Sequence, residues 1–147
     1  MATSDAPGVR RLCLALVPAL LLSASGFLLF VGLHDLAVSV AVELGRSLRG
    51  GVGWGLTVQL AFYAFAILLL MFNVAAISWP ARRVHLAVLA WGAFAVLLTL
   101  LANPFASWSH PYRFLLLQSC ALAGFGLSLA GQGLWSRHLS ERQGHVR

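Results

Sequence analysis

The sequence predicts an all-α protein: a polytopic membrane four-helix bundle with an interfacial amphipathic helix after the first span. Four long apolar runs carry this prediction, because about 20 helical residues cross a hydrocarbon core of about 30 Å. No run has Lys, Asp or Glu in its interior. The 147 residues are 60% hydrophobic and 10% charged, with a mean hydropathy of +0.86. So few charged residues could not cover a soluble domain of this size.

The apolar runs define one domain at residues 12–136, between an N-terminal tail at 1–11 and a C-terminal tail at 137–147. We expect the spans at 12–33, 54–79, 84–102 and 113–135. Arg10 and Arg11, followed by an apolar stretch and the small residues 23–25, also resemble a signal peptide. Because apolar sequence continues without a break to Leu33, we expect the first helix to be retained.

Arginine positions predict the topology. Both tails and the connection at Arg82 and Arg83 are richer in positive charge than the other two connections, because Asp35 and Glu43 offset the arginines of the first connection and the third has only Arg113. Both termini should therefore be cytoplasmic. All ten basic residues are Arg, which is typical of GC-rich genomes and suggests a bacterial inner membrane. The formal net charge of +6 then indicates contact with anionic lipid of the bilayer, and we expect no nucleic-acid binding.

Residues 35–49 should form the interfacial helix. Asp35, Ser39 and Glu43 fall on one helical face, and Leu36, Val40 and Leu44 fall on the opposite face. Such a helix lies on the outer membrane surface, where it either covers the bundle or binds a ligand.

Small residues recur at helical spacing in the first and fourth spans, which predicts close helix packing. Stripes of this kind also favour a homo-oligomer or docking to a partner membrane or peripheral protein. The helix-packing candidates are Ser23, Gly26, Cys120, Gly124, Ser128 and Gly131.

Span two places Gln59, Tyr63 and Asn73 on one face. Polar side chains in hydrocarbon are costly without partners, so we expect this face to point into the bundle. Two roles are consistent with this polar face: hydrogen bonding between helices, or lining a pocket for a ligand such as a quinone. No other cofactor is evident.

Polar residues of the outer side form a second candidate cluster: His34, Asp35, Glu43, His110 and Arg113. We expect no metal there, because no pair of these residues has a recognisable metal-ligand spacing. Cys13 and Cys120 should lie on the order of 20 Å apart along the membrane normal, which is too far for a disulfide. No nucleophile–base pair or phosphate loop appears, so we expect no catalytic activity from this chain alone.

Two segments resemble the DoxX-like family of four-span membrane proteins. The end of span four, Gly131-Gln132-Gly133-Leu134-Trp135-Ser136, is similar to the family's G-P-G-x-[YW]-S ending, and Gly26–Leu33 resembles its G-x-x-F-x-x-x-G opening. Gln132 replaces the expected proline, Arg137-His138 replaces Leu-Asp, and the glycine–glutamate signature of span two is missing. The resemblance implies an accessory subunit of a membrane redox assembly.

The leading functional hypothesis is therefore an accessory or anchoring subunit of a membrane complex that is linked to quinone. The alternative is a homo-oligomeric small transporter or channel, although no ionisable group lies in the middle of a span to couple protons. A third hypothesis is a membrane enzyme that uses the outer polar cluster.

Overall fold

The computed structural model describes residues 6–45, 52–105 and 111–144, with side chains placed at 16–45, 55–102 and 112–138. Its described residues form four α-helices: α1 (Ala6–Glu43), α2 (Val52–Ser78), α3 (Arg83–Phe105) and α4 (Pro111–Gly144). A short 3₁₀ turn, η1 (Pro80–Arg82), joins α2 to α3. The predicted all-α class and the four-helix bundle are confirmed.

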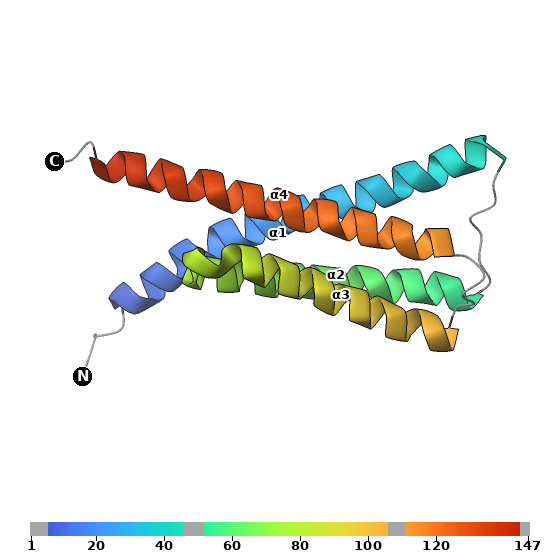
Figure 1. Cartoon of the computed structure of the whole chain (residues 1–147). Helices are drawn as coiled ribbons and strands as arrows, with labels where there is room; N and C mark the ends of the chain where they lie inside the picture. The colour runs from blue at the N-terminus through green and yellow to red at the C-terminus, as the bar shows by residue number, and fades with distance from the viewer. Residues whose placement is uncertain (1–5, 46–51, 106–110, 145–147) are drawn as a thin grey trace.

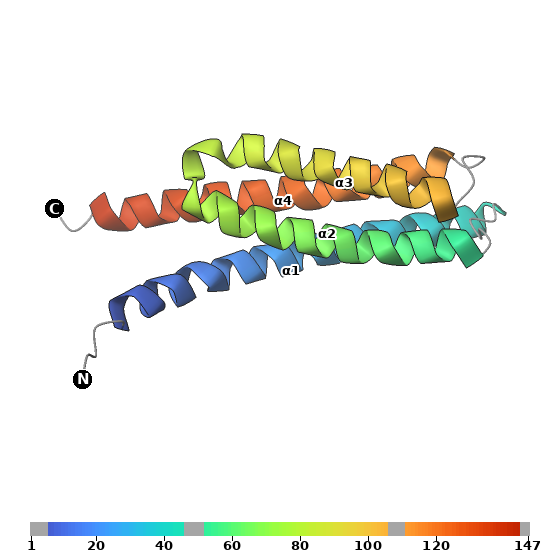
Figure 2. The same ribbon diagram turned by 90° about the horizontal axis from the view of Figure 1, so that it is seen from below.

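The helices pack in the cyclic order α1, α2, α3, α4, with α2 and α3 side by side as an antiparallel hairpin (Figures 1 and 2). Helices α1 and α4 cross near their middles and diverge toward their ends (Figure 1). The first residues of α1 and the last residues of α4 lie at the end of the bundle that also holds η1 (Figure 1). We call this the terminal end, and the opposite end the loop end.

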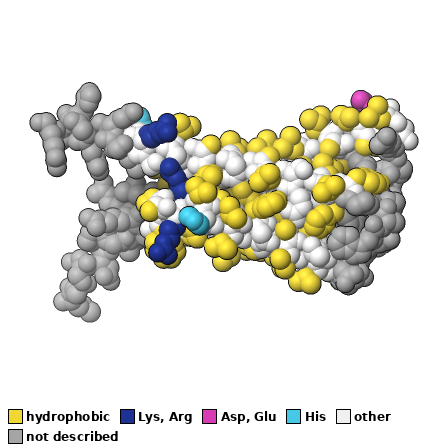
Figure 3. All heavy atoms as spheres, in the orientation of Figure 1, with side chains coloured by type: hydrophobic (Ala, Val, Ile, Leu, Met, Phe, Trp, Pro, Cys, Tyr) yellow, Lys and Arg dark blue, Asp and Glu magenta, His cyan; other side chains and the backbone are white. Residues whose placement is uncertain are grey.

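All four helices are long and apolar enough to cross a membrane, over Leu16–Glu43, Gly55–Ser78, Pro80–Ala102 and Tyr112–His138. Large hydrophobic side chains cover the outer surface of the bundle, as Figure 3 shows for one face. Apolar surface of this extent is stable against lipid and not against water. The chain is a multi-pass integral membrane protein.

Phenylalanine rings fill the centre of the bundle. Phe30 of α1 stacks on Phe65 of α2 with ring centroids 4.2 Å apart, and Phe94 of α3 meets both rings edge-on. Phe125 of α4 contacts Phe65 and Phe72 in the same edge-on manner. Edge-to-face and offset pairs are the favourable arrangements of aromatic rings. These contacts join all four helices in one core.

Helix α1 runs without a break from Ala6 to Glu43 and includes Pro18. The expected separate surface helix at 35–49 is therefore not confirmed, since residues 35–43 are the last turns of α1. The apolar positions Leu36 and Val40 continue the helical period beyond the first span, and no helix breaker intervenes. The helix ends at Glu43, and Gly45 in the following turn has a φ of +70°, which suits glycine just after a helix C-terminus.

Candidate functional site

A buried polar network joins three helices in the half of the bundle nearer the terminal end. Its centre is Asn73 of α2, which is fully buried. The Asn73 Nδ2 group donates to Ser23 Oγ of α1 at 3.0 Å and to Ser128 Oγ of α4 at 3.3 Å. Its Oδ1 atom accepts a 2.6 Å hydrogen bond from Gln132 Nε2 of α4. One amide thus connects α2 to both of the other helices.

The hydroxyl groups of the two serines donate hydrogen bonds to backbone carbonyl oxygens. Ser23 Oγ donates to Ala19 O at 2.7 Å, and Ser128 Oγ donates to Leu22 O at 3.2 Å. Each hydroxyl is therefore free to accept from Asn73, and both protons of the Asn73 amide are used. The Asn73 amide and both serine hydroxyls are thus paired, which avoids the cost of burying these groups without partners.

Two buried glutamines of α4 keep polar atoms without a protein partner in the described structure. Gln132 Oε1 accepts no hydrogen bond, and neither amide atom of the 8% exposed Gln118 is paired. Unpaired buried amides are costly, so these atoms are positions where water or a polar ligand would bind. The sequence analysis placed neither glutamine in a site.

The helix-packing candidates lie where α1 crosses α4. A Cβ atom added to Gly26 would lie 2.9 Å from the carbonyl oxygen of Gly124, and one added to Gly124 would lie 2.6 Å from Phe65 Cζ. A Cβ on Gly131 would overlap Leu22. Ser23 and Ser128 belong to the buried network, and Cys120 is 2% exposed. Only glycine allows the two backbones to come this close.

The structure separates the three predicted residues of span two. Gln59 is exposed and Tyr63 is 61% exposed, whereas Asn73 is fully buried. The expectation that this face points inward is wrong for Gln59 and Tyr63. The buried row of α2 passes through Thr57, Ala61, Phe65, Leu69 and Asn73 in steps of four. Gln59 and Tyr63 lie two residues, or about 200°, from members of that row.

The outer polar candidates are spread over the loop end. His34 Nδ1 lies 3.2 Å from Asp35 Oδ1, and the His34 ring meets Phe62 edge-on. Glu43 is exposed at the end of α1, while Arg113 is buried and lies 5.7 Å from the centre of the Tyr112 ring. His110 lies outside the described residues. Across the described part of the chain, no three His, Cys, Asp or Glu side chains are placed to hold a metal.

An apolar groove of about 540 Å³ opens between the loop-end half of α1 and α4. It lies where the two helices diverge beyond their crossing (Figure 1). Its lining residues are Leu33, Leu36, Ala37, Val40, Ala41, Leu44, Leu116, Ser119 and Cys120. The groove offers a single hydroxyl, so its surface suits hydrocarbon.

Comparisons with known proteins do not assign the chain to a family. No model of a known protein family matches the chain, and no curated protein or solved structure is significantly similar to it. The DoxX-like resemblance stays a prediction that rests on the quoted residues.

Proposed function

We propose that the protein is an accessory or anchoring subunit of a membrane complex. The observation that carries this proposal is the extension of α1 and α4 beyond the α2–α3 hairpin at the terminal end (Figures 1 and 2). Helices that leave the membrane as a separated pair present a surface to a partner. The bundle would anchor that partner in the bilayer.

The lengths of the helices support this view. Helix α1 has 38 residues and α4 has 34, so they are about 57 Å and 51 Å long at 1.5 Å per residue. A hydrocarbon core of about 30 Å requires only part of either helix. Arg83 at the start of α3 hydrogen-bonds Ser136 of α4, which aligns the hairpin with that position. Residues 137–144 of α4 therefore extend about 12 Å past the hairpin.

The packed interior supports a subunit over a transporter. Phe30, Phe65 and Phe94 are fully buried and in mutual contact at the centre of the bundle. A water-filled path through one copy would have to displace these rings. The alternative function, a transporter or channel, then requires a pathway between several copies.

The exposed residues Gln59 and Tyr63 support a partner within the membrane. They lie one helical turn apart on the outer face of α2, with apolar Ile67 exposed farther along the same helix. Polar side chains that face hydrocarbon are expensive and favour a polar contact. We place the proposed quinone link on this face, where a partner subunit or a quinone head group would supply the contact.

Replacing Gln59 with leucine and Tyr63 with phenylalanine is expected to weaken association with that partner or with quinone, because both polar contacts are lost. The measurement is the amount of partner recovered in a mild-detergent purification, together with quinone content. The double variant Ile67→Leu and Met71→Leu, on the same exposed side of the helix, is the control. Unchanged recovery and quinone content in the Gln59–Tyr63 variant would rule out this face.

Deleting residues 137–147 tests the anchoring role. Full-length protein purified from native membranes should carry a stoichiometric partner, and the truncated chain should retain the bundle but lose that partner. Retention of the bundle is checked by size-exclusion chromatography and circular dichroism. We also propose that both termini face the cytoplasm of a bacterium with this protein in its inner membrane, so the partner should be accessible from that side.

Two outcomes contradict the proposal. The first is a homo-oligomer without any partner that moves solute into liposomes, which would establish transport. The second is a partner that the truncated chain holds as tightly as the full-length chain, because the helix extension would then have no part in docking.

A further inference from the structure

We propose that the terminal end of the bundle holds a binding site for the phosphate of an anionic phospholipid, built by Arg83 and Ser136 and reinforced by Arg82. The site lies between the first residue of α3 and the last turns of α4 that remain level with the hairpin. This inference is independent of the proposed partner, since it concerns the lipid around the bundle.

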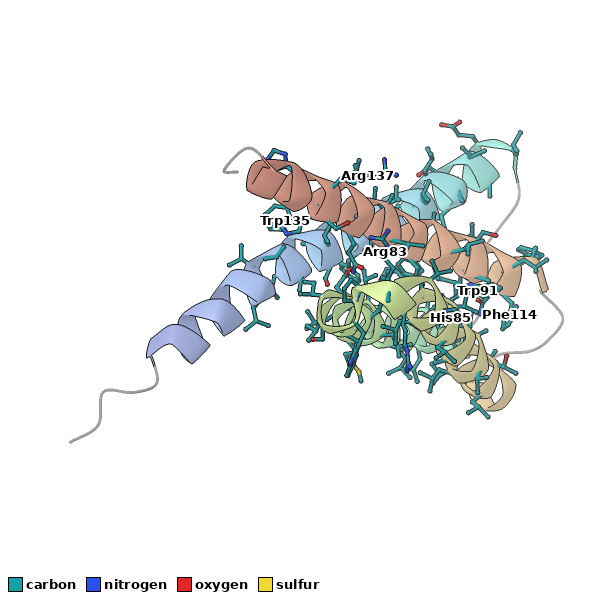
Figure 4. The ribbon with its side chains drawn as sticks, turned by 60° about the vertical axis from the view of Figure 1, so that its left-hand side comes forward. Arg83, His85, Trp91, Phe114, Trp135 and Arg137 are labelled. Carbon is teal, nitrogen blue, oxygen red and sulfur yellow. The ribbon has the colours of Figure 1, made fainter. Side chains whose placement is uncertain are left out.

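Arg83 is positioned across the gap between two helices. Its Nη1 atom lies 3.3 Å from Ser136 Oγ, and the Ser136 hydroxyl donates in turn to Gly133 O at 2.9 Å. A Cβ atom at Gly133 would lie 3.9 Å from the same Nη1, so the guanidinium rests against the surface of α4. Figure 4 shows Arg83 reaching from the beginning of α3 toward α4.

The hydrogen bond to Ser136 uses only one of the N–H donors of the Arg83 guanidinium. Arginine has five N–H donors in a planar fork, and this shape matches the oxygens of a phosphate. The bond to Ser136 fixes one edge of Arg83 against α4. The remaining donors stay available to a ligand at the surface of the bundle.

The charge around Arg83 is not balanced by nearby carboxylates in the described structure. Arg82 is exposed at the same end of the bundle. The two acidic side chains that the structure places, Asp35 and Glu43, lie at the loop end. Figure 3 shows this separation, with basic side chains at one end and an acidic side chain at the other. No described carboxylate lies near Arg82 and Arg83, so in this proposal a bound anion supplies their counterion.

The depth of the site identifies that counterion. Trp79 directly precedes η1 and is 60% exposed. Trp135 directly precedes Ser136 in α4 and is 50% exposed. Exposed tryptophans of a membrane protein mark the head-group level of the bilayer. Val84 and Leu134 are 55% and 67% exposed and continue the surface toward the hydrocarbon. Phosphate groups and acyl chains of one lipid fit these two adjacent zones.

An anionic lipid fits better than a zwitterionic one, because the cluster of arginines carries net positive charge. Attraction of arginine to an anionic leaflet is about 1 kcal/mol for each side chain near the surface, which corresponds to about fivefold in affinity. Two arginines that contact one lipid would together give a preference of about 30-fold.

The test is native mass spectrometry of the full-length protein, delipidated in detergent and titrated with phosphatidylglycerol or phosphatidylcholine. We expect phosphatidylglycerol to bind more tightly, Arg83→Gln to weaken it about fivefold, and the double variant Arg82→Gln with Arg83→Gln to weaken it about 30-fold. Arg46→Gln removes the same charge from the segment after α1 and should leave the affinity unchanged. Ser136→Ala keeps every charge but removes the hydrogen bond that holds Arg83 in place, so it should weaken binding.

Several results would overturn the proposal. Equal affinity for the two lipids would remove the anionic preference, and an equal loss in Arg46→Gln would show a general charge effect. If millimolar inorganic phosphate displaces bound phosphatidylglycerol, the site binds soluble anions and is not specific for lipid. If Arg83→Gln does not fold, Arg83→Lys provides the test: it keeps the charge but loses the planar fork, and undiminished binding would exclude the arranged guanidinium.

Discussion

Replacing Asn73 with leucine is expected to destabilise the bundle by about 1–3 kcal/mol, although the two side chains are similar in size. The asparagine amide donates to Ser23 and Ser128 and accepts from Gln132, so its loss breaks three hydrogen bonds between helices. The Gln132 amide would then have no hydrogen-bond partner in a buried position. Measured hydrogen bonds in membrane interiors average about 0.6 kcal/mol each, which sets the lower part of this range.

The measurement is the free energy of unfolding in mixed micelles with increasing SDS. Ser25→Ala is the matched control, because Ser25 is exposed and its hydroxyl donates only to Leu21 O of its own helix. The double variant Asn73→Leu with Gln132→Leu should be less destabilised than the sum of the two single variants, since no orphaned amide remains. Additive losses would show that the residues do not act as one network.

Placing a larger side chain at Gly124 is expected to force α1 away from α4, and Gly124→Leu should cost about 3 kcal/mol or more. Even the Cβ of an alanine would lie 2.6 Å from Phe65 Cζ and 2.9 Å from the Gly26 carbonyl oxygen. The phenylalanine ring is held by Phe30, Phe94 and Phe125, and the backbone of Gly26 is helical. Neither neighbour can move without disturbing the core.

Gly126 provides the control, because it lies two residues away in the same helix and a Cβ there would have open space within 4 Å. Gly126→Ala should be neutral or stabilising by up to about 1 kcal/mol through the helix propensity of alanine. The unfolding assay in SDS compares Gly124→Ala, Gly124→Leu and Gly126→Ala. Equal stability of Gly124→Ala and Gly126→Ala would contradict the close crossing of α1 and α4.

The candidate sites were predictable to different extents. The small-residue stripes marked close-packing faces on the first and fourth spans, because the absence of side-chain volume is visible in the sequence, but the stripes did not predict that these two faces contact each other. The polar face of span two was only partly correct. Its members share a helical face by residue spacing, but the buried row of α2 advances in steps of four and includes Asn73 without Gln59 or Tyr63.

Partners of the polar residues depended on tertiary structure. Asn73 bonds to residues 50, 55 and 59 positions away, so the spacing along the chain carries no signal for them. Gln132 seemed to be only a departure from a family pattern, yet it completes the network. The contact between Arg83 and Ser136 likewise joins two helices whose alignment is set by the length of the hairpin and by the packing of α4.

The sequence by itself determined the number of spans, the helical class and the concentration of arginine at one end. These features follow from the hydrophobicity and length of each segment, which are properties of the chain alone. Only the tertiary structure decided that α1 continues through Glu43, that Tyr63 faces outward and that Asn73 joins three helices. Those features depend on how each helix is rotated and tilted against its neighbours, and packing of the phenylalanine core and the close glycine contacts fixes those angles.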